Sequence, residues 1–171
     1  MKTYSYLQHK PTLSPKSRIF PGAIVTGDVI LGDDVSVWFN AVIRGDMSLV
    51  TILEKTNIQD HAMIHTNTDK PTYIGKNCTI GHRAIIHACT IGNDVLIGMG
   101  SIILDGVIIG DGAMIGAGTV VPPNKVIPPK MLAYGNPMMI TRQLTKEELA
   151  ANRKNAVKYV EMMNNYVFEE E

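Results

Sequence analysis

The chain has 171 residues and no formal net charge, with 16 basic and 16 acidic side chains, which argues against nucleic acid or an anionic membrane as a partner. It contains 20 isoleucines and 14 valines but 10 leucines, and because β-branched side chains favour strands, this excludes a helical bundle and predicts a single all-β domain. Its two cysteines, Cys78 and Cys89, are too few for a disulfide framework and favour a cytoplasmic location.

Residues 1–18 form an N-terminal segment, after which aliphatic residues recur every six positions, with short interruptions, over residues 19–123. A period of six matches neither the 3.6 of a helix nor the alternation of a simple strand. It predicts a left-handed parallel β-helix of hexapeptide repeats, in which three hexads make one turn and the seventeen aliphatics stack inside five to six coils. Glycine often follows the aliphatic residue, and we expect it to supply the corner dihedrals.

The repeat ends at Pro122-Pro123, and residues 124–144 form a Pro-rich connection that we expect to leave the ladder. Residues 145–171 are predicted to form a C-terminal helix and an acidic tail, Glu169–Glu171, because Thr145 to Glu148 has the pattern of a capping box. The stripe expected to pack on a face of the solenoid or on a neighbouring subunit consists of Leu149, Ala156, Val160, Met163 and Val167.

Two histidines occupy equivalent positions of the repeat, one coil apart. His65 follows Ile64, and His87 follows Ile86 three hexads later, so both lie in one column of one face. Because stacked strands lie about 4.8 Å apart, the two imidazoles are expected to be close enough to share a metal ion.

A third histidine, His82, lies on the preceding face and cannot easily join this pair within one chain. A closed threefold assembly would set that face of one subunit against the His65/His87 face of the next, which predicts a homotrimer with three-histidine sites at its interfaces. The alternative is a set of interface histidines without metal. We expect His9 and His61 to be structural or exposed.

Further polar residues share these columns. Arg44 aligns with His65 and His87, whereas Asp60 aligns with His82 and has Gln59 beside it. Polar partners near metal-bound histidines orient the rings and fix their tautomers, so these side chains are expected to support the site.

Several longer segments occur in a fixed order between about residue 10 and residue 145. They are Asn40-Ala41-Val42-Ile43-Arg44-Gly45-Asp46, Asn57-Ile58-Gln59-Asp60, Ile80-Gly81-His82, His87-Ala88-Cys89-Thr90-Ile91-Gly92, Leu96-Ile97-Gly98-Met99-Gly100, Leu104-Asp105-Gly106 and Tyr134-Gly135-Asn136-Pro137. With these segments the sequence resembles the γ-class carbonic anhydrases and their relatives, some of which are labelled ferripyochelin-binding or hexapeptide transferase-like proteins.

The resemblance implies a left-handed β-helix homotrimer with a metal ion at each interface, bound by His65 and His87 of one subunit and His82 of the next. Zinc is the implied ion, with iron(II) or cobalt(II) as alternatives. The implied enzyme is a carbonic anhydrase-like lyase, in which metal-bound hydroxide hydrates carbon dioxide reversibly to bicarbonate.

The resemblance also assigns catalytic roles to four polar residues. Gln59 and Asn57 would orient the hydroxide or the substrate, and Tyr134 and Asn136 would approach the same cavity.

Arg44 and Asp46 resemble the ion pair that holds two subunits of this family in register. Two departures from the family pattern bear on activity: Met47 stands where active members carry a glutamate, and the short loop 66–73 has Asp69 in place of further glutamates. Because hydration requires a proton to leave the metal-bound water, we expect weak or lost activity.

Two other functions fit the same repeat. The first is coenzyme A-dependent acyl transfer, with His82 or His87 as general base and the Gly135-Asn136-Pro137 turn holding the coenzyme. The second is a non-catalytic metal-binding trimer whose partner is another protein.

Overall fold

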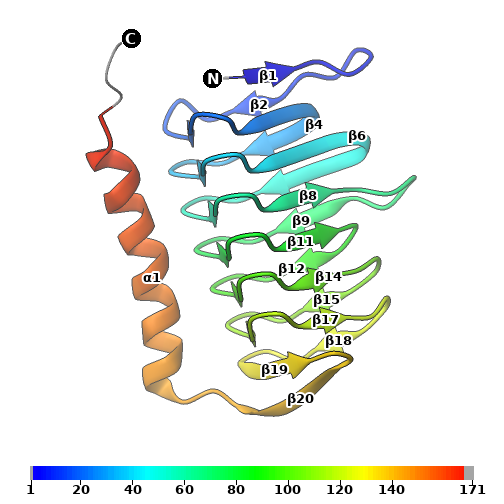
Figure 1. Cartoon of the computed structure of the whole chain (residues 1–171), viewed down its shortest axis with the longest axis vertical. Coiled ribbons are helices and arrows are strands. Elements are labelled where there is room, and N and C mark those ends of the chain that lie inside the picture. The colour runs from blue at the N-terminus through cyan, green and yellow to red at the C-terminus, as the bar shows by residue number, and fades with distance from the viewer. Residues whose placement is uncertain (1, 168–171) are drawn as a thin grey trace.

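The computed structural model describes residues 2–167, which form a parallel β-solenoid of about seven turns with one C-terminal helix (Figure 1). The predicted left-handed β-helix class is confirmed. Successive turns place their strands on three faces, which we call face 1, face 2 and face 3, and every strand except the last pairs in parallel with the strand one turn away.

Face 1 is a separate eight-stranded sheet. It consists of β3 (Arg18–Ile19), β5 (Ser36–Val37), β7 (Asn57–Ile58), β10 (Thr79–Ile80), β13 (Leu96–Ile97), β16 (Met114–Ile115), β19 (Met131–Gly135) and β20 (Met138–Gln143). The last strand, β20, runs antiparallel to β19 and closes the end of the solenoid.

Faces 2 and 3 form one twelve-stranded sheet, because β4 (Ile24–Leu31) and β6 (Val42–Ile52) run from one face into the other. Face 2 also contains β1 (Lys2–Tyr4), β8 (Met63–His65), β11 (Ile85–His87), β14 (Ile102–Ile103) and β17 (Val120–Val121). Face 3 also contains β2 (Thr12–Leu13), β9 (Thr72–Ile74), β12 (Thr90–Ile91), β15 (Ile108–Ile109) and β18 (Val126–Ile127).

The solenoid is longer than the predicted five to six coils, because the chain continues it beyond both ends of residues 19–123. Strands β1 and β2 pair with β4, and β18 and β19 pair with β15 and β16. The expectation that residues 124–144 leave the ladder is therefore wrong. Pro122-Pro123 and Pro128-Pro129 fall in the segments after β17 and β18, where no ladder hydrogen bond is interrupted within a strand.

The interior is a continuous stack of the aliphatic residues that define the period of six. All seventeen are buried, which confirms the predicted phase of the repeat. The expected role of the recurring glycines is wrong, however. A Cβ added to Gly98 would lie 2.5 Å from the backbone nitrogen of Ala117 on the next coil, so glycine is required there for close stacking, whereas left-handed dihedrals occur at other turn residues such as Asn40.

The C-terminal helix α1 (Lys146–Asn165) begins with the predicted capping box: the Thr145 side chain accepts from the Glu148 N–H, and the Glu148 carboxylate accepts from the Thr145 N–H. Ala156 and Met163 of the predicted stripe are buried. The prediction for Val167 is wrong, because this residue lies beyond the end of α1 and is 84% exposed. The predicted acidic tail, 169–171, lies outside the described residues.

Helix α1 runs back along the solenoid and packs against strands β5, β7 and β10 of face 1 (Figure 1). Its C-terminal half is held by an aromatic cluster in which Trp38 stacks on Phe20 at 4.2 Å and meets Tyr159 of α1 edge-on. Arg18 donates hydrogen bonds to the carbonyls of Met163 and Tyr166, where a cation also complements the helix dipole. Among residues 2–167, no helix combines the length and apolarity needed to cross a membrane.

The capping box makes the stability of α1 depend on pH. The Arg142 guanidinium, and then the Thr145 N–H, lower the pKa of Glu148 to about 2 from its ordinary 4.5. Because the folded pKa is depressed, the stabilisation is present above pH 4.5 and is lost as the pH falls from about 4.5 to about 2. Since the pair is exposed, solvent screening keeps this contribution small.

We therefore expect Glu148→Gln to be less stable than the wild type near neutral pH and to lose less further stability on acidification. Denaturant unfolding followed by Trp38 fluorescence at several pH values measures this difference. Glu161→Gln, an exposed change on the same helix, serves as the control and should follow the wild-type pH profile. Parallel profiles for Glu148→Gln and the wild type would contradict the assignment.

Candidate metal centre

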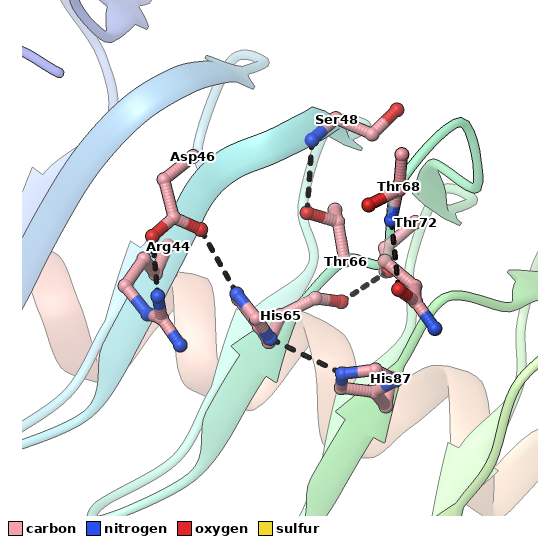
Figure 2. Close-up of polar contacts among 9 residues, drawn as sticks. Arg44, Asp46, Ser48, His65, Thr66, Thr68, Thr72 and His87 are labelled. Atoms are coloured by element: carbon pink, nitrogen blue, oxygen red, sulfur yellow. Dashed lines mark hydrogen bonds and ion pairs between the residues drawn. The ribbon is translucent and has the colours of Figure 1, made fainter.

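His65 and His87 lie side by side on face 2, at the ends of the adjacent strands β8 and β11. They are direct register partners, and their ring centroids are 5.1 Å apart. His65 Nδ1 lies 3.1 Å from His87 Nε2, so the two rings face each other through one nitrogen each (Figure 2). The structure thus brings these residues together at the positions that the repeat predicts.

The outer nitrogen of each ring faces a carboxylate. His65 Nε2 lies 2.9 Å from Asp46 Oδ1, and His87 Nδ1 lies 2.6 Å from Asp105 Oδ1. Burial raises the pKa of Asp46, but hydrogen bonds from His65 and Arg44 outweigh it and hold that pKa below its ordinary value. The pKa of Asp105 is also lowered, first by the Asn67 amide and then, against the effect of burial, by His87.

Two ionised carboxylates fix the tautomers of both histidines. An ionised carboxylate only accepts hydrogen bonds, so each outer ring nitrogen must carry the proton. In the neutral rings, His65 Nδ1 and His87 Nε2 are then both unprotonated, and their lone pairs face each other across 3.1 Å. Two lone pairs at this distance repel unless a proton or a metal ion lies between them.

This donor set fits a metal ion. Two imidazole nitrogens at the usual zinc distance of about 2.0–2.1 Å, with tetrahedral geometry, are about 3.3 Å apart, close to the observed separation. A carboxylate on the second ring nitrogen is the usual arrangement for a metal-bound histidine, because it sets the tautomer and raises the basicity of the ligand. His65 and His87 therefore have the geometry of two ligands to one ion.

Arg44 extends the site by one strand. It is the register partner of His65 on β6, and its Nη1 donates to Asp46 Oδ2 (Figure 2). The pair of Arg44 and Asp46 thus exists within a single chain, where it holds the Asp46 carboxylate against His65.

His82 does not belong to this cluster within one chain. It lies in the turn before β11, at the opposite end of that strand from His87, and its Nδ1 is 2.7 Å from Asp60 Oδ2. The side chain of His82 is 42% exposed. Over residues 2–167 of a single chain, no group of three histidine, cysteine or acidic side chains could hold a metal ion.

Gln59 and Asn57 lie beside His82 on face 1. The Gln59 side-chain oxygen accepts from the His82 backbone N–H at 3.1 Å, and Gln59 Nε2 donates to Asn57 Oδ1 at 3.1 Å. Both residues are at least 95% buried, so these hydrogen bonds hold the two side-chain amides in place.

Tyr134 and Asn136 are not near Gln59 within one chain. Tyr134 is on β19, four strand steps from β7 along face 1, which corresponds to about 19 Å. Asn136 follows β19 in the turn before β20. The grouping of these two residues with Gln59 and Asn57 stays a prediction that a single chain does not satisfy.

Two polar residues of the site were not predicted. Asp105 approaches His87 from the turn after β14, and Asn67 of the loop 66–73 donates to Asp105 Oδ2 at 2.8 Å. Asp105 belongs to the segment Leu104-Asp105-Gly106 and lies two positions after an interior isoleucine, the same offset as Asp60 and His82. This shared offset is the sequence pattern that indicates Asp105 as a site residue. Asn67 lies in an interruption of the repeat, where no such pattern indicates it.

A groove of about 370 Å³ opens beside His82 along face 1. Gln59, Thr79 and His82 line one end, Leu96, Met99 and Met114 line the remainder, and Asn155 of α1 forms one side. The groove is therefore polar next to His82 and apolar farther along the solenoid.

Comparisons with known proteins agree with this architecture. The family described as bacterial transferase hexapeptide (six repeats) matches residues 71–101 and 88–123. A protein of Methanocaldococcus jannaschii named "Probable carbonic anhydrase" is 51% identical over 150 residues, which cover 88% of this chain and 94% of that protein. The "Carbonic anhydrase" of Geobacillus kaustophilus is 41% identical over 163 residues, covering 95% of this chain and 90% of the relative.

Among solved structures, a hexapeptide transferase family protein from Anaplasma phagocytophilum superposes with a TM-score of 0.94. It is 36% identical, and the match covers 97% of this chain and 98% of that one. The names of these similar proteins thus point to two chemistries, carbonic anhydrase and group transfer.

The contact between Asp105 and His87 predicts that the Asp105 carboxylate contributes to metal affinity. Asp105→Asn removes the charge that holds the His87 tautomer, so we expect Zn²⁺ affinity, measured by isothermal titration calorimetry, to fall by about 10- to 100-fold. Asp69→Asn, which removes an exposed charge from the loop 66–73, is the matched control and should bind as the wild type does. Wild-type affinity in Asp105→Asn would contradict the role of this carboxylate.

Proposed function

This chain belongs to the hexapeptide-repeat family that includes the γ-class carbonic anhydrases, and from that membership we propose that it is a metal-dependent lyase that hydrates carbon dioxide reversibly. The observation that carries the proposal is the facing pair of ring nitrogens of His65 and His87, which lie 3.1 Å apart with a carboxylate behind each ring. A metal ion bound by both nitrogens would satisfy their lone pairs together.

We assign the third ligand, His82, to a neighbouring subunit of a homotrimer. Face 2 supports this assembly, because its outward row is apolar on six successive coils. The row consists of Ile24, Val42, Met63, Ile85, Ile102 and Val120. Threefold closure buries this row in a heterologous interface and completes three equivalent sites. Zinc is the proposed ion, with iron(II) or cobalt(II) as alternatives, because imidazole ligands suit all three.

A metal ion held by His65, His87 and a neighbour's His82 would lower the pKa of a water bound to it to about 7. The chain's own residues prepare the site for that chemistry. Asp46 and Asp105 hold the outer ring nitrogens of His65 and His87, and Asp60 lies 2.7 Å from His82 Nδ1.

Gln59 is the proposed orienting residue for the substrate. Its oxygen is occupied by the His82 N–H and one N–H is occupied by Asn57, which leaves its second N–H as the remaining donor. Asn57 fixes the Gln59 amide in this orientation. Tyr134 and Asn136 act in the same cavity only if the trimer brings them there from another subunit.

A shared site makes a distinctive prediction for mixed trimers. His82→Ala and His87→Ala should each remove nearly all bound zinc when present alone. Because one variant keeps His65 and His87 and the other keeps His82, random assembly of equal amounts of both chains should restore about a quarter of the sites.

Zinc content of differently tagged, co-expressed chains measures this recovery. Co-expression of His65→Ala with His87→Ala is the control, because each of these chains lacks one ligand of the same pair and no site can be completed. Absence of zinc in the mixed His82→Ala and His87→Ala trimers would contradict the shared site.

The level of hydratase activity depends on proton removal. Met47 is exposed next to Asp46, and the loop 66–73 offers Asp69 as its one acidic residue. Because a positioned acid or base typically contributes about 10²- to 10⁴-fold, we expect slow turnover in the wild type and an increase of at least tenfold in Met47→Glu. Stopped-flow hydration assays on zinc-loaded protein test both, and fast wild-type turnover would contradict the expectation.

A second candidate function, coenzyme A-dependent acyl transfer, is favoured by the groove beside His82. About 370 Å³ is far more space than carbon dioxide needs, and its apolar length suits an extended acyl chain. In this proposal, His82 or His87 is the general base. A metal-free trimer that binds coenzyme A would support transfer, whereas an ion lost in His82→Ala supports the lyase; a bound ion with neither activity would support the non-catalytic metal-binding trimer.

We also propose a cytoplasmic location. Cys78 and Cys89 are both free and buried. Burial raises the pKa of each thiol to about 12, so neither is a reactive thiolate at neutral pH. Unpaired cysteines of this kind are typical of reducing compartments.

A further inference from the structure

A continuous chain of hydrogen bonds links α1 to the turn that carries His82. Asn155 of α1 donates from Nδ2 to Thr79 Oγ1 at 3.1 Å, and Asn57 Nδ2 donates to the same oxygen at 3.1 Å. Asn57 Oδ1 then accepts from Gln59, whose own oxygen accepts from the His82 N–H. Asn57 on β7, Gln59 directly after β7, Thr79 on β10, His82 in the turn before β11 and Asn155 on α1 thus form a single polar path.

This path fixes the orientation of the Asn57 and Gln59 side-chain amides next to His82. The Thr79 hydroxyl oxygen has two lone pairs, and Asn155 and Asn57 occupy both. Asn57 also donates to the Cys78 carbonyl at 3.2 Å, so a reversed Asn57 amide would set its oxygen against that carbonyl. With Asn57 fixed, Gln59 must present its nitrogen to Asn57 and its oxygen to His82.

We propose that Asn155 is a positioning residue of the metal centre, which acts through Thr79 to fix the amides of Asn57 and Gln59 and thereby the His82 turn. The role of these amides toward a substrate rests on the proposed function, whereas the positioning itself does not. Asn155 also lines the groove together with Gln59, Thr79 and His82, so the helix contributes directly to the surface beside the site.

Helix α1 does not depend on Asn155 for its attachment to face 1. Its first turn is capped by Thr145, and its last turn accepts hydrogen bonds from Arg18. Arg153 forms an ion pair with Asp94 at 2.9 Å, and Met163 packs into the aromatic cluster. Loss of the Asn155 amide should therefore leave the helix docked and act locally.

The experiment measures hydrogen exchange of the His82 amide by NMR in the full-length, metal-free protein. Asn155→Leu and Thr79→Val should each accelerate this exchange by at least tenfold. The double variant should exchange no faster than the single ones, because both changes break the same path. Thr79→Ser, which keeps the acceptor oxygen, should rescue wild-type exchange.

Asn164→Leu is the matched control, because it makes the same chemical change at an exposed position of α1 and should leave exchange within twofold of the wild type. Wild-type exchange of His82 in Asn155→Leu would overturn the proposal. Equal acceleration of all face 1 amides together with weakened Trp38 contacts would also overturn it, since Asn155 would then only anchor the helix.

Cobalt(II) absorption gives a second readout on the assembled protein. In Asn155→Leu we expect unchanged cobalt stoichiometry but a shifted visible spectrum, whereas Asn164→Leu should retain the wild-type spectrum. An unshifted spectrum in a variant with accelerated His82 exchange would overturn the link to the metal centre. If the wild type itself binds no cobalt, the proposed function fails, while the exchange measurement still decides the positioning of His82.

Discussion

The register between successive coils is the constraint on which the rest of this protein depends. Each strand bonds to the strand one turn away, so every position of the hexad is repeated about 4.8 Å farther along the solenoid. Inside, this stacks isoleucine on isoleucine; outside, it stacks Arg44 on His65 and His65 on His87. A slip of one residue would turn His87 into the interior and Ile86 to the surface.

The repeat positions His65 and His87, and the interruptions of the repeat supply polar residues around them. The extra residues after Ile43 lengthen β6 and carry Asp46, and those after Ile64 form the loop that carries Asn67. Both insertions are absorbed at the junction of faces 2 and 3, where the register shifts in β4 and a bridge between Asn67 and Lys70 closes the loop. The interior phase is thus preserved, while carboxylate and amide groups reach the histidines from outside the ladder.

Face 1 explains why the C-terminal helix belongs to the same functional unit. Its outward side chains at Ser36, Asn57 and Thr79 are polar and would be costly to bury without partners. Trp38 Nε1 donates to Ser36, and Asn155 donates to Thr79, so the surroundings of this face satisfy each buried group. The docking of α1 and the arrangement of polar groups next to His82 therefore depend on the same contacts.

The sequence by itself determined the coil, its interior and the stacking of His65 on His87, because a period of six fixes both the phase of every side chain and its neighbour one turn away. The hexad offset of Asp105 indicates a site position, but its pairing with His87 depends on how a turn projects from the coil, which the sequence does not specify. The prediction that the chain leaves the ladder after Pro123 is wrong, because proline excludes a ladder only inside a strand and these prolines fall between strands. The rotation of α1 about its axis, which brings Asn155 to Thr79, was decided only by tertiary packing, because the apolar stripe that predicts a buried face says nothing about the polar residues beside it.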